Sequence, residues 1–361
     1  MKWPNHGGQP ETIKQLLHLK SEQPLLDFSA NLNPLGPPAW LKEALADCYE
    51  SITHYPDPSY SSSSLAVAQH ENIEPDSVLV TNGGAEAIFL VAKYFENGKA
   101  LIVHPTFLEY ERACRHYHIE VEDIYYEQEH GFTLPMQDVL GRMKEKDVIF
   151  VCRPNNPTGT VIAERDLQQI VEEGQKTGTY IVVDEAFVDF LPTSTASLTS
   201  WLAGYPNLIL LRSLTKMYTI PGLRIGYLMA HPTICKVLRN EQIPWSINSL
   251  VNAIVPKLLE DTSFVEQTRS WLREQSDVIR SNLSSLDFYQ SPSQVNFYLL
   301  QDKREPKRTE ELFHFLVKHG IVTRHTHNFK GLNGQFLRLA IRSKHENEIL
   351  FATLKKWRMQ S

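Results

Sequence analysis

The sequence predicts an α/β protein with a mostly parallel central sheet covered by helices, joined to a smaller α+β domain. One observation is length, because 361 residues exceed the usual single-domain size. Another is composition, since 42% hydrophobic and 22% charged residues are typical of a folded globular chain. The third is a series of short apolar runs that alternate with segments of helical period, which indicates parallel strands joined by helices. These runs are Ser77–Val80, Ala100–Val103, Val148–Cys152, Tyr180–Val183, Leu208–Leu211 and Gly226–Met229.

The elements divide the chain into three parts. Residues 1–45 are rich in Pro, Gly and Asn, with one clear helix around Glu11–Leu19, and are interpreted as an arm that contributes to the small domain and the active site. Residues 46–246 hold the apolar runs and form the large domain, in which Ser61–Ser64 marks a loop or a helix start. Residues 247–361 form the small domain, whose expected elements are helices at Thr262–Leu283 and Arg308–His319 and strands at Val295–Leu300 and Phe336–Ile341.

Charge and composition exclude several classes of function. The net charge is −6, and the basic residues are scattered, so we expect no nucleic-acid partner. No stretch reaches the about 18 apolar residues of a membrane span, and the N-terminus lacks an apolar signal, so a cytoplasmic protein is expected. The cysteines are too widely spaced for a metal or redox motif and are expected to be reduced: Cys48, Cys114, Cys152 and Cys235.

The segment Arg212–Tyr227 carries the richest chemistry. It directly follows an apolar strand and holds Ser213, Thr215, Lys216 and Arg224. Open α/β sheets bind ligands outside the carboxyl ends of their strands. A lysine amine there can form an imine with a phosphorylated aldehyde, while the hydroxyls and the guanidinium hold its phosphate. Taken alone, Lys216 and Arg224 are more often solvated surface residues.

Two further strand ends carry groups that suit a pyridoxal ring. Asp184 ends the run Val182–Val183, where its carboxylate can keep a pyridine nitrogen protonated; capping of a following helix is the alternative. Asn156 lies in Arg153–Gly159, after another strand, where its amide can donate to the phenolic oxygen. By itself that segment is an ordinary turn sequence.

A glycine turn and an aromatic residue complete the candidate cofactor site. Leu79–Ile88 reads as strand, turn and helix, and would direct the backbone N–H groups of Gly84 and Ala85 at a phosphate. A dinucleotide site is the rival interpretation, but the full G-x-G-x-x-G spacing is absent. Phe107 can stack on the pyridine face, although it reads equally well as a core residue.

Taken in order, Asn156, Asp184, Ser213-x-x-Lys216 and Arg224 resemble the fold-type I aminotransferase superfamily. This resemblance implies pyridoxal 5'-phosphate as the cofactor, with Lys216 as the Schiff-base lysine. It places Ser213, Thr215, Arg224 and the Gly84 turn on the cofactor phosphate. It also implies a homodimer in which Tyr55, in His54–Asp57, reaches the partner's cofactor phosphate.

Within the superfamily, the chain is similar to histidinol-phosphate aminotransferases and to L-threonine-O-3-phosphate decarboxylases of cobalamin biosynthesis. The segments that favour the decarboxylase family are His6–Gly8, Leu26–Gly36, Arg212–Lys216, Ile220–Arg224, Pro244–Ser246 and Leu339–Arg342. Phe187 also favours it, because the aminotransferases usually carry tyrosine there. The resemblance implies decarboxylation of L-threonine O-3-phosphate to (R)-1-amino-2-propanol O-2-phosphate. Transamination of histidinol phosphate with 2-oxoglutarate is the alternative.

The same resemblance implies a set of substrate-binding residues. Arg338 matches the position that binds the α-carboxylate, and Arg324 brackets the substrate phosphate with neighbours from the arm and the partner's Tyr55. The expected set is His6, Gly7, Asn31, Asn156, Arg324 and Arg338. Because the Cα bond perpendicular to the pyridine plane is the one that breaks, Arg338 decides between loss of the carboxylate and loss of the proton.

Two rival classes fit the sequence poorly. Ser213-x-x-Lys216, Ser246-Ile-Asn248 and Lys176-Thr-Gly178 resemble the elements of penicillin-recognising serine enzymes, but their order along the chain is wrong. A transcription regulator built on the same fold would need an added basic DNA-binding domain, for which the chain has no room.

Overall fold

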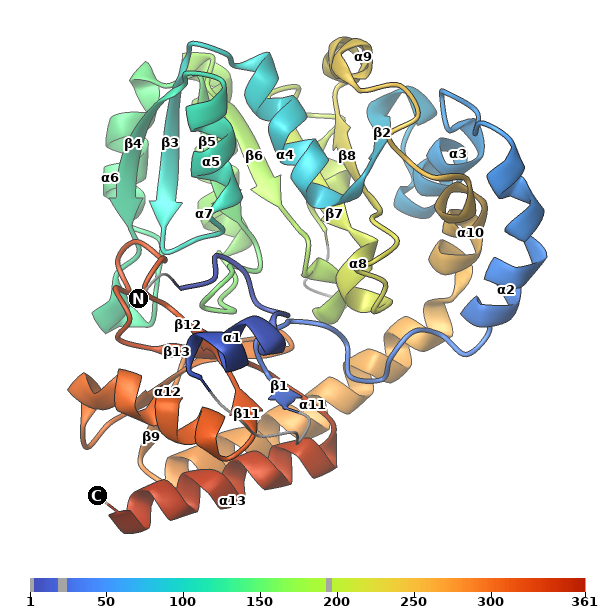
Figure 1. Cartoon of the computed structure of the whole chain (residues 1–361). Helices are drawn as coiled ribbons and strands as arrows, with labels where there is room; N and C mark the ends of the chain where they lie inside the picture. The colour runs from blue at the N-terminus through green and yellow to red at the C-terminus, as the bar shows by residue number, and fades with distance from the viewer. Residues whose placement is uncertain (1–2, 19–24, 193–196, 361) are drawn as a thin grey trace.

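The computed structural model describes residues 3–18, 25–192 and 197–360. Figure 1 shows two lobes: the upper one is built around a large sheet, and the lower one contains the N-terminal arm and the C-terminal helices. The division of the chain at residues 45 and 246 stays a prediction. No helix in the described part of the chain is both long and apolar enough to span a membrane.

The upper lobe contains a seven-stranded sheet with the strand order β2-β8-β7-β6-β5-β3-β4. Its strands are parallel except β8, which is antiparallel to both neighbours, β2 and β7. The strands are β2 (Val78–Thr81), β3 (Lys99–His104), β4 (Glu120–Tyr125), β5 (Val148–Cys152), β6 (Tyr180–Asp184), β7 (Leu208–Ser213) and β8 (Gly226–Ala230). All six expected runs form strands, so the mostly parallel sheet is confirmed. The sequence missed β4, because this edge strand is only partly buried and carries three acidic residues.

Helices cover both faces of the sheet, which explains why its strands read as continuous apolar runs. In β5, Phe150 packs with α4 and α5, while Ile149 and Val151 point into the other core with α3 and α7. The helices of the upper lobe are α2 (Leu41–Asp47), α3 (Ser61–Glu71), α4 (Gly83–Tyr94), α5 (Glu109–His116), α6 (Met136–Arg142), α7 (Glu164–Thr177), α8 (Leu214–Met217), α9 (Pro232–Glu241) and α10 (Ser249–Glu260). The serine tract is therefore a helix start.

The lower lobe contains a four-stranded antiparallel sheet with the order β12-β13-β10-β9, packed against three helices. Its strands are β9 (Phe288–Gln290), β10 (Phe297–Asp302), β12 (Arg324–His325) and β13 (Leu337–Ala340), and its helices are α11 (Thr262–Ser285), α12 (Thr309–Lys318) and α13 (Lys344–Gln360). The four elements expected after residue 247 correspond to α11, β10, α12 and β13. The sequence did not predict α13 or the short strands.

The arm is built into the lower lobe. Its strand β1 (Leu26–Asp27) pairs in parallel with β11 (Ile321–Val322), and Ala340 N donates to Phe28 O at 2.8 Å. The helix expected around Glu11–Leu19 is α1 (Pro10–Leu16), and Leu19 lies outside the described residues. The expectation of a single helix within residues 1–45 was wrong, because a second helix, α2, begins at Leu41.

The parallel strands place their carboxyl ends on the side that faces the lower lobe (Figure 1). In the register, Cys152 lies beside Asp184, and Asp184 lies beside Leu211. The segments that follow β5, β6 and β7 therefore emerge next to one another, between the two lobes.

Candidate active site

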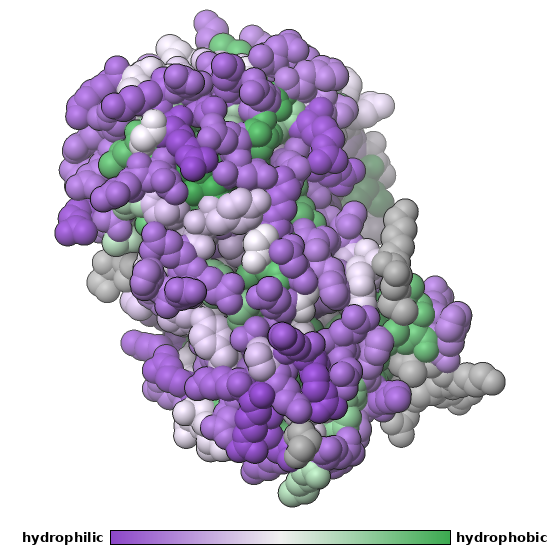
Figure 2. All heavy atoms as spheres, turned by 90° about the vertical axis from the view of Figure 1, so that its left-hand side faces the viewer, coloured by the Kyte–Doolittle hydropathy of each residue, from purple (hydrophilic) through white to green (hydrophobic). Residues whose placement is uncertain are grey.

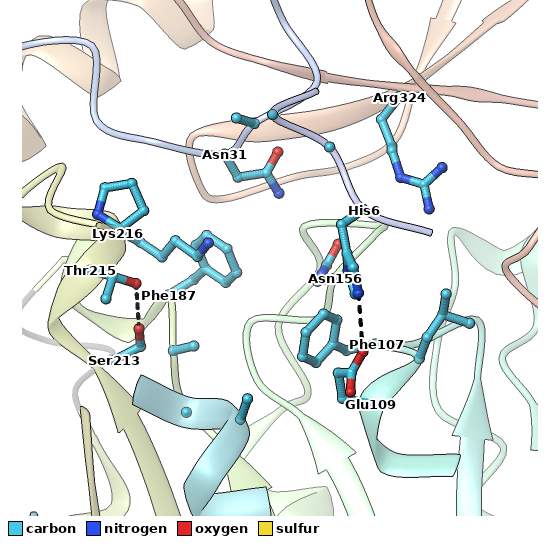
Figure 3. A pocket seen from close by; sticks show the side chains of 18 of the residues that line it. His6, Asn31, Phe107, Glu109, Asn156, Phe187, Ser213, Thr215, Lys216 and Arg324 are labelled. Atoms are coloured by element: carbon cyan, nitrogen blue, oxygen red, sulfur yellow. Dashed lines mark hydrogen bonds and ion pairs between the residues drawn. The ribbon is translucent and has the colours of Figure 1, made fainter. Parts of the chain in front are cut away.

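A pocket of about 690 Å³ lies between the strand ends and the arm. Every site residue expected from the sequence lines it, with the exception of Tyr55. Figure 3 labels ten of the lining residues, with Lys216 on one side and His6 and Arg324 on the other. The expected residues brought together are His6, Gly7, Asn31, Gly84, Ala85, Phe107, Asn156, Asp184, Ser213, Thr215, Lys216, Arg224, Arg324 and Arg338.

Lys216 lies in α8, directly after β7. Desolvation lowers the pKa of Lys216 to about 8, with a further lowering from the positive charges of Arg338 and Arg224, while Asp184 acts in the opposite direction. A lysine with a pKa near 8 is partly a neutral amine at neutral pH, and the neutral amine is the form that attacks a carbonyl. Its environment therefore suits covalent attachment of an aldehyde.

Asp184 is a buried carboxylate held by two donors. Tyr110 donates from its hydroxyl to Asp184 Oδ2 at 2.6 Å, and Ala186 N donates to Oδ1 at 2.9 Å. Burial raises the pKa of Asp184, and these two bonds lower it. A cationic ring nitrogen beside the carboxylate would offset the cost of burial. The sequence did not identify Tyr110, which lies in the first turn of α5.

A cradle for an anion forms at the end of β7 and the start of α4. Ser213 Oγ and Thr215 Oγ1 lie 2.8 Å apart. Across from them, a Cβ built on Gly83 would lie 2.7 Å from Arg224 Nη2, and Gly83 has a φ of 75°. A side chain at Gly83 would be strained and would displace the guanidinium. Hydroxyls, a guanidinium and a helix N-terminus together suit a phosphate. The sequence pointed to Gly84 and Ala85 but missed Gly83.

Two buried arginines occupy the lower side of the pocket. Arg324 on β12 and Arg338 on β13 are register partners, with 3% and 6% of their surfaces exposed. Burial lowers the pKa of Arg338 to about 9 and that of Arg324 to about 10, so both stay cationic at neutral pH. No carboxylate among the described residues lies within ion-pair distance of either guanidinium. Buried cations of this kind call for anionic ligands.

The hydrogen bonds of these arginines fix their direction. Arg338 Nη1 donates to Asn156 Oδ1 at 2.6 Å, and Nη2 donates to Ser29 O at 2.7 Å. Arg324 Nη2 donates to Asn5 O at 2.7 Å. Because Asn156 accepts through Oδ1, its amide nitrogen is free to serve as a donor to a ligand oxygen. Asn31 Oδ1 is buried, with no hydrogen-bond partner among the described residues.

The remaining expected residues have more ordinary contacts. Phe107 lies with its ring centroid 5.9 Å from that of Tyr110, and its stacking on a cofactor stays a prediction. Phe187 lines the pocket and packs against Phe297, with ring centroids 4.8 Å apart. Tyr55 is 82% exposed, lies outside the pocket and contacts Trp245 with ring centroids 4.9 Å apart. Its reach to a partner's cofactor also stays a prediction.

The pocket also contains charged residues that the sequence did not indicate. Asp27, Glu109 and Arg112 line it, and Glu109 contacts His6. No local pattern signals these residues, because the packing of the arm brings Asp27 to the pocket and that of α5 brings Glu109 and Arg112.

Comparison with known proteins agrees with this geometry. Residues 23–354 match the family described as aminotransferase class I and II. The threonine-phosphate decarboxylase of Salmonella typhimurium is 36% identical over 97% of this chain and 95% of its own length.

Two solved structures resemble the chain over most of its length. The L-threonine-O-3-phosphate decarboxylase of Porphyromonas gingivalis has a TM-score of 0.80 at 27% identity, covering 91% of this chain and 98% of its own. The histidinol-phosphate aminotransferase of Clostridium acetobutylicum has a TM-score of 0.88 at 26% identity, covering 93% of this chain and 100% of its own. These likenesses confirm the expected fold-type I architecture. With its parallel sheet, its strand-end lysine and its match over nearly the whole length, the chain belongs to the aminotransferase class I and II family.

Proposed function

We propose that this chain catalyses the pyridoxal 5'-phosphate-dependent decarboxylation of L-threonine O-3-phosphate to (R)-1-amino-2-propanol O-2-phosphate in cobalamin biosynthesis. The observation that carries the proposal is a pair of buried arginines, Arg324 and Arg338, which lie in one pocket with Lys216 and form no ion pair with a carboxylate in the described part of the chain. A substrate with two anionic groups, a carboxylate and a phosphate, satisfies both. The 36% identity to the decarboxylase of Salmonella typhimurium supports this choice of substrate.

The residues present fit pyridoxal 5'-phosphate. Lys216 offers the amine for its aldehyde, and Asp184 offers a buried carboxylate for its ring nitrogen. Ser213, Thr215 and Arg224 offer donors for its phosphate, beside the Gly83 turn. When bound, this cofactor supplies an electron sink that accepts the electron pair of a broken Cα bond.

The chain's own residues orient and protonate the substrate. Arg338 is held at two points, by Asn156 and by the Ser29 carbonyl oxygen, so its planar fork can fix the direction of the α-carboxylate. Decarboxylation would require Arg338 to hold this carboxylate so that its bond to Cα, rather than the Cα–H bond, is the one that breaks. Lys216 would supply the proton that Cα takes up after the carboxylate leaves as carbon dioxide.

We also propose that the protein is a cytoplasmic homodimer in which Tyr55 reaches the partner's cofactor phosphate. Its exposed ring contacts the exposed ring of Trp245, and two exposed aromatic rings side by side support burial against a second copy. The cysteines are all free, as is usual for proteins of reducing compartments.

A paired assay tests the function. Borohydride reduction of the purified holoenzyme is expected to fix a pyridoxyl group on Lys216, and the Lys216→Ala variant is expected to gain none. O-phospho-L-threonine is expected to release carbon dioxide without any keto acid. Turnover that requires histidinol phosphate together with 2-oxoglutarate would overturn the proposal in favour of transamination.

A further inference from the structure

An ion pair joins the arm to the upper lobe within the pocket wall. His6 Nε2 lies 3.1 Å from Glu109 Oε1. Figure 3 shows the imidazole pointing from the arm toward this carboxylate, beside Phe107. His6 belongs to the arm, whereas Glu109 is the first residue of α5 in the upper lobe. The pair therefore ties together two parts of the molecule that line opposite sides of the pocket.

The backbone on both sides of His6 is anchored to the lower lobe. Arg324 Nη2 donates to Asn5 O at 2.7 Å, and Trp3 stacks on His327 with ring centroids 5.1 Å apart. Gly7 lies so close to Ser29 that a Cβ at position 7 would overlap the Ser29 carbonyl oxygen. Since the backbone is fixed, the direction of the His6 side chain depends on the group that it contacts.

Glu109 is an unusual residue for this place. Its surface is 6% exposed although the carboxylate carries a charge, and it lines a pocket proposed to bind anions. The hydrogen bond from His6 lowers the pKa of Glu109 and is the largest influence on it. Arg112 adds a contact at 3.4 Å, but its side chain is 71% exposed, so water screens that charge. The main partner of the carboxylate is therefore His6.

We propose that Glu109 is a positioning residue for phosphate recognition: its carboxylate accepts the Nε2 proton of the His6 imidazolium and leaves the Nδ1–H group to donate to an oxyanion of the substrate. An acceptor on one imidazole nitrogen commonly orients the ring for a ligand on the other nitrogen. Identification of that oxyanion as the substrate phosphate rests on the proposed function. A carboxylate near a phosphate also repels it, so the loss of Glu109 has two opposing effects, and the sign of the result distinguishes them.

Steady-state kinetics of the holoenzyme give the first test. We expect Glu109→Gln to raise the KM for O-phospho-L-threonine about 10-fold, as for the loss of an orienting partner, with kcat within about twofold. In a His6→Ala background, the same change should raise KM no further. A KM that falls, or that rises equally in both backgrounds, would overturn the proposal.

Glu111→Gln is the matched control. Glu111 lies on the same helix, but it pairs with Arg115 at 2.9 Å and with Lys330 at 3.0 Å and is not among the pocket residues. Its loss removes a carboxylate of the same charge from α5 without touching His6. We expect its KM and kcat to match those of the unmodified enzyme.

Hydrogen–deuterium exchange gives a test that does not depend on the substrate. In the holoenzyme without substrate, residues 3–9 should exchange faster in Glu109→Gln than in Glu111→Gln, because a neutral amide holds His6 less strongly than the carboxylate does. Equal exchange in the two variants would overturn the positioning role. If the unmodified enzyme fails to turn over O-phospho-L-threonine, the proposed function fails, while the exchange result still decides the role of Glu109.

Discussion

Removal of one hydroxyl, in Tyr110→Phe, tests how the buried carboxylate of the site is tuned. Tyr110 donates to Asp184 at 2.6 Å, and its ring stacks on Phe150 with centroids 5.5 Å apart. Phenylalanine keeps the ring and its packing but deletes the donor. The pKa of Asp184 is then expected to rise, because burial already raises it and the bond from Tyr110 is the largest influence that lowers it.

The magnitude follows from the type of bond. A hydrogen bond to a charged group contributes about 1.5–3 kcal/mol. If Tyr110→Phe weakens the interaction between Asp184 and the cofactor ring nitrogen by the lower end of this range, the dissociation constant for pyridoxal phosphate rises about 10-fold. We expect kcat to fall as well, since a carboxylate that is more readily protonated stabilises the cationic ring less.

Equilibrium binding of pyridoxal phosphate to the apoenzyme measures this effect. Tyr126→Phe is the control, because Tyr126 is also buried but its hydroxyl has no hydrogen-bond partner among the described residues. Its removal is expected to leave cofactor affinity unchanged. Equal affinity in Tyr110→Phe and the unmodified protein would refute the role assigned to the Tyr110 hydroxyl.

Two further predictions concern the charges around the pocket. The rate of covalent attachment of pyridoxal phosphate to the apoenzyme should rise with pH through a midpoint of about 8, because the amine of Lys216 is protonated below its pKa. Arg338→Met removes a cation that lowers this pKa, so stopped-flow measurement should find the midpoint at higher pH, and an unmoved midpoint would contradict the assignment. Arg324→Lys keeps the positive charge but loses the planar guanidinium that binds an oxyanion through two parallel hydrogen bonds. The kcat/KM for O-phospho-L-threonine should therefore fall about 10-fold or more. The same substitution should leave turnover of L-threonine nearly unchanged, and an equal loss with both substrates would argue against a phosphate contact.

The sequence predicted much of the site because the relevant motifs are local and the topology is regular. Asp184 ends a buried apolar strand, while Asn156 and Lys216 each follow one, and neighbouring strands of this kind end at the same edge of the sheet. Strand β4 escaped prediction, because a partly exposed edge strand with acidic residues lacks the apolar run that marked the others.

The tertiary structure decided which side chains complete the site. Arg324 and Asn5 are 319 positions apart in the sequence, yet a hydrogen bond joins them. The contacts of Tyr110 with Asp184 and of His6 with Glu109 likewise depend on how α5 and the arm pack, and no local pattern encodes those distances. The sequence by itself therefore determined the sheet apart from β4, together with the strand-end groups, since an apolar run is a local property. The partners that tune and orient those groups were decided only by long-range packing, which brings the arm and the lower lobe over the strand ends.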